Sequence, residues 1–251
     1  MKRIWGRALA AMAVSVVAIS ACVSNDGSLF VQGVLAPPTA GADGTCVYTS
    51  TATGPFISVG TLDVALGSQY IPTLLIANQL VQVGAATQSR VETNRVQLQG
   101  AIVRVTSAAG AELRSYTVPS SGFVDVATGG TPGYGAVSTV LVDSDTVNSL
   151  RQQLGAVGSG LIRLLVYVKV YGVTLGGTHV ETGEYQFPVN ACFGCLVNFP
   201  ADSVSPPPSP QPNCLEVSGG SGGGTLARPC VTGQDQAIDC RLCQGNIACT
   251  P

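Results

Sequence analysis

The sequence has few basic residues. Lysine and arginine together number 12 of 251 residues, against 14 acidic residues and one histidine. Three of the basic residues, Lys2, Arg3 and Arg7, stand in the first seven positions, so residues 22–251 carry a formal charge of about −5. No stripe of lysine and arginine is present that could neutralise the phosphates of a nucleic acid. We therefore expect no binding of DNA or RNA.

Histidine is scarcer still, and its scarcity limits catalysis. His179, the only one, lies in the turn-like segment GGTH, so a Ser/His/Asp triad would have to use it. Residues 219–223 formally match GxSxG, but they belong to a glycine tract that lacks the strand and helix a nucleophile elbow requires. We expect no catalytic residue, no cofactor and no resident metal.

A hydrophobic run long enough to cross a membrane is also lacking. The longest, from Ala8 to Ala21, has about fourteen residues, whereas a membrane-spanning helix needs about 20. Lys2, Arg3 and Arg7 precede it, and a charged segment followed by a short apolar run is typical of a secretion signal. Residues 1–21 are thus predicted to be a signal peptide.

The run ends at Ile19, Ser20, Ala21 and Cys22, which resemble the lipobox of bacterial lipoproteins. The resemblance implies that Cys22 becomes the N-terminus of the mature chain and carries a diacylglycerol thioether, with a further acyl chain in most Gram-negative bacteria. Two or three chains give stable anchoring where one is marginal. Val23, in place of an inner-membrane-retaining aspartate, favours the outer membrane. The alternative is an ordinary signal peptide, with Cys22 a plain thiol.

Export also governs the other eight cysteines. Outside the cytoplasm thiols tend to pair, and an even number is compatible with four disulfides, although eight cysteines allow 105 connectivities. The disulfide candidates are Cys46, Cys192, Cys195, Cys214, Cys230, Cys240, Cys243 and Cys249.

Two CxxC motifs offer other chemistry. CFGC (192–195) and CRLC (240–243) could supply four thiolates to zinc, but 44 residues separate them and the compartment favours oxidation. A thioredoxin-like redox role would need CFGC at the start of a helix, and it follows an apparent final strand instead. Structural disulfides are the preferred interpretation.

Between residues 29 and 192 short apolar segments alternate with Gly, Pro, Asn and Ser, which is typical of an all-β sandwich or barrel. We predict strands within residues 29–37, 45–50, 56–66, 69–84, 95–107, 112–119, 122–128, 134–143, 161–173 and 180–192. Pro72 indicates an edge strand or an irregular start. A change of phase near Gly100 predicts a bulge, and residues 108–110 a hairpin turn.

The clearest strand is 161–173, where alternate residues from Ile162 to Val170 form an apolar face. Its other face carries Tyr167, Lys169 and Tyr171, so it is aromatic and partly wet, as in a sandwich strand. The segments TLLIANQLV, NRVQLQGAIVRV and FPVNAC resemble the fibronectin-like β-sandwich of late-embryogenesis-abundant and water-stress domains. The resemblance spans roughly residues 60–190.

One helix interrupts the strands, in DSDTVNSLRQQLG. Asp143 or Ser144 can cap it, Val147, Leu150 and Leu154 recur at helical spacing, and Gly155 is predicted to end it. Asp143–Asp145 could also suggest calcium, but capping explains these residues more simply. A single helix argues against a parallel α/β sheet, whose crossovers are usually helical.

These features predict an all-β protein, an antiparallel Ig/fibronectin-like sandwich at 29–200, after a tether at 22–28. Residues 201–251 hold a Pro/Gly-rich linker and a Cys-rich tail, either stapled by its own disulfides or tied back onto the sandwich.

The expected function is that of a lipid-anchored envelope protein at the outer membrane, on its periplasmic or cell-surface face, with a noncatalytic structural role or an envelope protein partner. A small-molecule- or lipid-binding module, which would need an apolar cleft, is the alternative. A CxxC thiol–disulfide redox protein is less favoured.

Overall fold

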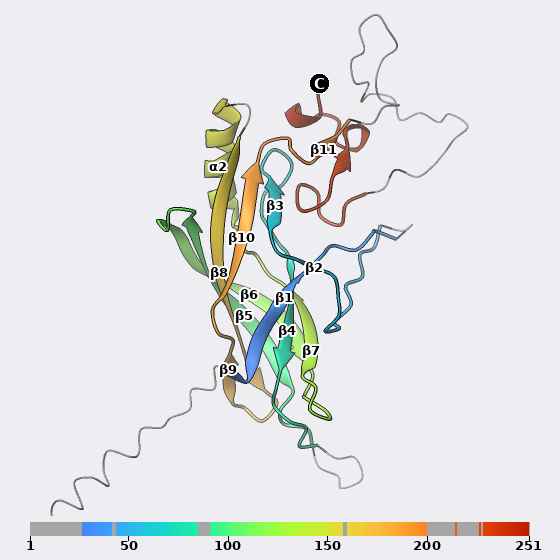
Figure 1. Ribbon diagram of the computed structural model, residues 1–251, viewed down its shortest axis with the longest axis vertical. Coiled ribbons are helices and arrows are strands. Elements are labelled where there is room, and N and C mark those ends of the chain that lie inside the picture. Colours follow the sequence, from blue (N-terminus) through green and yellow to red (C-terminus); the bar gives the residue numbers. More distant parts are fainter. Residues whose placement is uncertain are drawn as a thin grey trace, which may run out of the picture.

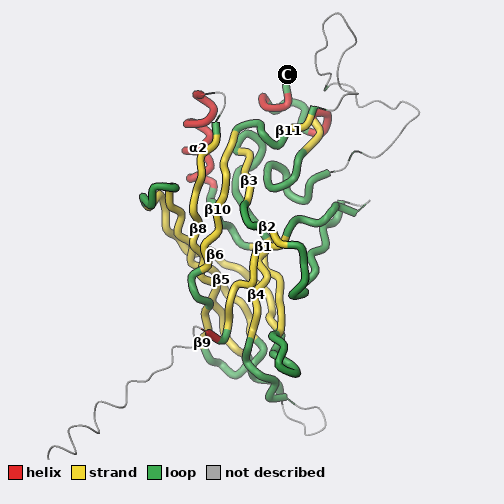
Figure 2. The backbone as a smooth tube through the Cα atoms, viewed as in Figure 1, coloured by secondary structure: helices red, strands yellow, loops and turns green. Residues whose placement is uncertain are grey.

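The computed structural model describes residues 27–41, 44–84, 91–157, 160–199, 214, 226 and 228–250. Strands dominate these residues, and they include one α-helix and short 3-10 turns near the C-terminus (Figure 1, Figure 2). The predicted mostly-β fold with a single short helix is confirmed.

A four-stranded antiparallel sheet has the order β2-β1-β4-β7. Its strands are β1 (Leu29–Leu35), β2 (Phe56–Ile57), β4 (Thr73–Asn78) and β7 (Gly133–Ser138). All six residues of β4 are buried because the strand lies inside the sheet and against the core. Pro72 directly precedes it, so the proline marks an irregular start and the edge-strand alternative is wrong.

A six-stranded sheet has the order β3-β10-β8-β5-β6, with β9 also paired to β8. Its strands are β3 (Gly60–Asp63), β5 (Val96–Ser107), β6 (Glu112–Val124), β8 (Leu161–Thr174), β9 (His179–Glu181) and β10 (Tyr185–Cys192). β10 ends at Cys192 as predicted. The expectation of wholly antiparallel pairing is wrong at β3, which lies parallel to β10 with Gly60 opposite Val189. This pairing joins segments far apart in sequence, so local pattern gives no sign of it.

The predicted bulge and hairpin of β5 are confirmed. Register shifts between Leu98 and Gly100 in its pairings with both neighbours. Tyr171 lies so close over Gly100 that a Cβ there would overlap its ring, which explains the glycine. The turn into β6 uses Gly110 at a φ of 85°, a left-handed conformation that favours glycine.

Several predicted strands differ in the structure. Residues 180–192 are divided between β9 and β10, and the predicted strand 134–143 ends at Ser138. Residues 45–50 form no strand, and the residues that pair with the edge of β1 are Phe56–Ile57. Residues 56–66 supply only the short β2 and β3, and 122–128 is no separate strand because β6 continues to Val124.

The helix α2 (Ser144–Val157) is capped by Asp143, whose Oδ1 accepts a hydrogen bond from the Thr146 N–H at 3.1 Å. Val147, Leu150 and Leu154 are buried, as predicted. The predicted end at Gly155 is wrong: the helix continues to Val157.

One core joins both sheets and the helix. It contains residues from β1, β4 and β7, the inward residues of β5, β8 and β10, and the apolar side of α2. Figure 1 shows α2 beside the upper half of β8, while β1, β4 and β7 occupy the lower half of the view. The alternation of β8 is confirmed, with every second residue from Leu164 to Thr174 buried.

Where β7 meets the end of β6, a glycine permits the contact. A Cβ on Gly135 would overlap the backbone carbonyl oxygen of Phe123. We predict that Gly135→Ala lowers the free energy of unfolding by about 1–3 kcal/mol, the usual cost of overpacking. Urea denaturation checks this. Gly183→Ala is the control, since a Cβ there meets nothing within 4 Å; equal effects of the two variants would contradict the assignment.

Candidate functional site

The eight candidate cysteines form four disulfides: Cys46–Cys230, Cys192–Cys195, Cys214–Cys240 and Cys243–Cys249. CFGC closes on itself, whereas the two cysteines of CRLC pair elsewhere. The tail is therefore both stapled internally and tied back to the chain before β2. The four CxxC sulfurs are divided among three disulfides, so in this state they offer no thiolates to zinc.

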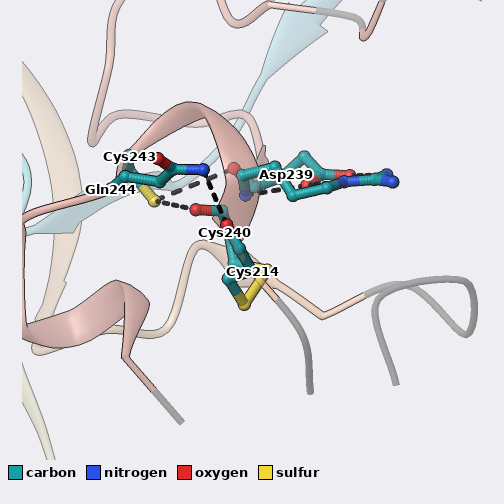
Figure 3. Close-up of polar contacts among 6 residues, drawn as sticks. Cys214, Asp239, Cys240, Cys243 and Gln244 are labelled. Atoms are coloured by element: carbon teal, nitrogen blue, oxygen red, sulfur yellow. Dashed lines mark hydrogen bonds and ion pairs between the residues drawn. A yellow bond between two sulfur atoms is a disulfide. The ribbon is translucent and has the colours of Figure 1, made fainter. Parts of the chain in front are cut away.

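Inside the tail, hydrogen bonds supplement the disulfides (Figure 3). Asp239, in β12 (Ile238–Asp239), caps a 3-10 turn by accepting from the Arg241 N–H at 2.9 Å, and its carboxylate pairs with the Arg241 guanidinium at 2.7 Å. This partner lowers the pKa of Asp239. The Gln244 amide donates to the Cys214 carbonyl at 2.8 Å.

Two adjacent tail residues reach into the sheets. Asp235, at a φ of 59°, accepts hydrogen bonds from the Thr61 N–H at 2.7 Å and from the Tyr70 hydroxyl at 2.9 Å. Gln234 accepts from the Ile71 N–H at 2.8 Å and donates to the Ile71 carbonyl at 2.9 Å. The tail thus supplies partners for polar groups beside a fully buried tyrosine.

Burial changes the acidity of both groups in this contact. Desolvation raises the pKa of Asp235, opposed in part by the donors Thr61 and Tyr70. Desolvation first, and then the Asp235 charge, raises the pKa of Tyr70. Because the folded state holds the Asp235 proton more tightly than the unfolded state, this group adds stability as pH falls through its raised pKa toward the unfolded value of about 4.

We predict that Asp235→Asn removes this contribution. When the pH is lowered from 7 to about 4, the pKa of an aspartate in the unfolded chain, the free energy of unfolding of the native chain should rise relative to that of the Asp235→Asn variant. Urea denaturation at both pH values, without reductant, measures the difference. Asp125→Asn, a change at an acid with a 69% exposed side chain, is the control. Parallel pH profiles for the native chain and the Asp235→Asn variant would refute the assignment.

A second buried carboxylate fixes the CFGC turn. Asp63 is fully buried, and its carboxylate accepts hydrogen bonds from the N–H groups of Gly194 at 2.8 Å, Leu196 at 3.0 Å and Ala65 at 3.0 Å. Its oxygen lies within 4.8 Å of the sulfurs of Cys192 and Cys195. The two sulfurs are bonded to each other, and two of the three donors, Gly194 and Leu196, come from the turn and the residue after it, so this arrangement stabilises the turn.

The same geometry bears on redox chemistry at CFGC. The motif follows β10 and not the start of a helix, so no helix dipole lowers a thiol pKa there. The neighbouring Asp63 carboxylate would disfavour a thiolate, since like charges repel. Neither feature favours a reactive thiol.

The acidic pair before α2 already has a cationic partner. The guanidinium of Arg114 pairs with Asp143 and Asp145, each at 2.6 Å. Capping and this ion pair account for the two carboxylates, which weakens the calcium interpretation. Sequence reasoning missed Arg114 because it comes from β6, about thirty residues away.

The remaining motifs of the sequence fall in different places. His179 begins β9 and is exposed. Cys22 and the GxSxG match at 219–223 lie outside the described residues. The aspartates that a triad with His179 could have used, Asp125 and Asp143, pair with Arg95 and Arg114 instead.

The side of the six-stranded sheet that faces away from the core carries an ordered set of aromatic, aliphatic and charged side chains. Cross-strand register places Ile102 opposite Lys169 and Arg104 opposite Tyr167. The Arg104 guanidinium lies 4.1 Å from the centre of the Tyr167 ring. It also donates to both carboxylate oxygens of Glu184, at 2.9 and 3.0 Å.

A second ion pair and two apolar residues complete this surface. Lys169 pairs with Glu181 at 2.9 Å, and Ile102 beside it is 43% exposed. Tyr171 lies across Gly100. We call this surface the outer face. It comprises Gly100, Ile102, Arg104, Tyr167, Lys169, Tyr171, Glu181 and Glu184. The sequence predicted the aromatic character of β8 here, but not the stacking of Arg104 or its pairing with Glu184.

Two of the hollows formed by the described residues are considered as ligand sites. One, of about 460 Å³, lies between residues 79–82 and 127–132. The other, of about 330 Å³, lies between α2 and the β5–β6 hairpin, with Leu113, Leu150 and Gln153 among its lining. Both have mixed polar and apolar linings, so neither is the apolar cleft that a lipid-binding module needs.

Comparison with known proteins places the chain in no family: no protein-family profile matches it, and no curated protein matches its sequence. Among the described residues, no helix is both long and apolar enough to span a membrane.

Proposed function

We propose that the protein is a lipid-anchored, noncatalytic component of the bacterial envelope that binds a protein partner at the outer membrane through its outer face. The observation that carries the proposal is the ordering of the charged and aromatic side chains on that face. Arg104 is held by both Tyr167 and Glu184, and Lys169 by Glu181. Side chains fixed before binding lose less conformational entropy when a partner arrives.

The residue types on the outer face also support a protein partner. Tyrosine and arginine are enriched at the centres of protein interfaces and among the residues that dominate binding energy. Ile102 adds apolar area between Tyr167 and Tyr171 on the same face. Ion pairs that are about one-third to one-half exposed contribute little to stability themselves, so contact with a partner is a better reason for their arrangement.

The finer fold is proposed as an Ig/fibronectin-like sandwich whose two sheets approach closely on one side, where β7 meets β6. Two sheets enclosing one core support it, as does the alternation of β8 between the core and the outer face. The parallel strand β3 and the close approach of β7 to β6 are departures from that pattern.

The disulfides support export of the chain. Four disulfides among the described cysteines require an oxidising compartment to form and persist. That compartment agrees with a signal peptide at residues 1–21 and with lipid attachment at Cys22. The lipid would supply the contact with the membrane, and the outer face the contact with the partner.

Intact-mass analysis of the protein isolated from membranes tests the anchor and the disulfides together. We expect a chain that begins at Cys22 and carries two or three acyl chains, and that gains eight hydrogens on reduction of its four disulfides. A Cys22→Ser variant is the control for the lipid mass. An unmodified Cys22 would refute the anchor, and free thiols before reduction would refute the disulfides.

Photo-crosslinking in intact cells tests the outer face. A photoreactive residue at Ile102 should capture a reproducible envelope protein, whereas one at Ile247, which is 76% exposed and lies in the tail, should not. Arg104→Ala should reduce capture from position 102, because the stacked guanidinium is lost, while thermal unfolding changes little. Equal capture from positions 102 and 247, or none from 102, would contradict the proposal.

The alternative, a small-molecule- or lipid-binding module, finds less support. The two described hollows are open and of mixed polarity, and the inner faces of the two sheets fill their shared core with side chains. The interaction role is therefore preferred.

A further inference from the structure

One end of the molecule gathers loops around the start of β1. The N–H of Gln79 donates to the carbonyl of Ser28 at 2.7 Å, and Leu29 bridges to Thr182. Val81 bridges to Ala127 in the loop after β6. Figure 1 shows these segments together below β9, β4 and β7. We call this region the anchor end, comprising residues 79–84, 91–95, 127–132 and 175–178.

Three of the four described segments of the anchor end are uncharged, and the end is partly apolar. Residues 79–84, 127–132 and 175–178 contain no Asp, Glu, Lys or Arg. Val81 is 67% exposed, Val91 78% and Leu175 51%. Contact between these apolar side chains and water is unfavourable, and burying them in an interface of mixed polarity would remove part of that free-energy cost.

Charges near these tips are satisfied within the chain. The carboxylate of Glu92 accepts from the N–H groups of Val83 at 3.0 Å, Gly84 at 2.8 Å and Asn94 at 2.7 Å. Arg95 pairs with Asp125 at 2.9 Å. Glu92 and Arg95 therefore bring no unpaired charge to the lipid headgroups, and Arg90, the remaining charged residue of this loop, lies outside the described residues.

The short length of chain between Cys22 and β1 favours a membrane as the surface that this end contacts. Four residues separate Cys22 from Gly27, and the five residue steps between them span at most about 18 Å when fully extended. A lipid on Cys22 thus keeps the start of β1, and the loops around it, close to the bilayer surface. Because the tether is short, the anchor end meets the bilayer at a high effective concentration, so even a weak attraction between them is enough for contact.

Exposure alone does not distinguish the two ends of the molecule. At the opposite end Val157 is 72% exposed and Ile247 76% exposed, which matches Val81 and Val91. Only the anchor end lies next to the start of β1, so the bilayer is the occupant that the tether favours there.

We propose that the anchor end rests on the lipid bilayer that holds the acyl chains of Cys22, with Val81, Val91 and Leu175 inserted among the headgroups. The inference rests on the proposed lipid anchoring and adds to it a fixed orientation of the domain. The hollow of about 460 Å³ between residues 79–82 and 127–132 opens at the same end and offers room for lipid headgroups.

The sequence allows a sensitive test. The only tryptophan is Trp5. It lies in the proposed signal peptide and is lost when that peptide is cleaved, so a single introduced tryptophan is then the sole reporter in the mature chain. Val81→Trp, Val91→Trp and Leu175→Trp report on the anchor end. Val157→Trp and Ile247→Trp, at positions of matched exposure, are the controls. Each full-length lipidated protein is reconstituted in phosphatidylethanolamine–phosphatidylglycerol vesicles, with and without brominated acyl chains.

We expect blue-shifted emission and quenching by the brominated lipid for the three anchor-end variants, and water-like, unquenched emission for the two controls. Intact mass confirms the lipid on each sample first, so an unmodified Cys22 would refute the proposed anchoring itself. In lipidated samples, unquenched emission at positions 81, 91 and 175 would overturn the inference, as would equal quenching at position 247. Quenching at position 247 but not at positions 81, 91 and 175 would also overturn the inference, because it would indicate the reverse orientation.

Discussion

The hydrogen bond from the hydroxyl of Tyr70 to Asp235 ties together parts of the molecule that the chain keeps far apart. Tyr70 is fully buried and stacks on Phe187, so its hydroxyl needs a partner that water cannot supply. Asp235 supplies it, and in the same place accepts the N–H of Thr61 at the edge strand β3. The tail therefore completes the core at this end instead of hanging from it.

Other contacts make sense once the tail is held there. β12 pairs with β11 (Val197–Asn198), and the Asn246 amide donates to the Ala65 carbonyl at 2.7 Å. Asp63 holds the CFGC turn beside them through the backbone N–H groups of Gly194 and Leu196. The tail segments are short and bury little apolar area. Disulfides stabilise them because they limit the entropy of the unfolded chain.

Sequence reasoning succeeded where the signal is local and failed where it is not. The alternation of β8, the bulge beside Gly100 and the cap at Asp143 depend on neighbouring residues, and each is found as predicted. The parallel pairing of β3 and the roles of Asp63 and Asp235 depend on partners more than a hundred residues away. An aspartate in a half-apolar strand carries no local sign of its partner, just as eight cysteines carry no sign of their pairing.

The two proposed surfaces constrain each other. β5 and β8 run the length of the six-stranded sheet, from the anchor end at Val96 and Thr174 toward the opposite end (Figure 1). With the anchor end on the bilayer, these strands rise from the membrane, and the outer face stands roughly perpendicular to it. A partner held in the same membrane would meet Arg104 and Tyr167 from the side, already confined to two dimensions, so an interface of modest affinity would suffice. The proposed orientation at the membrane would therefore determine how a partner reaches the outer face.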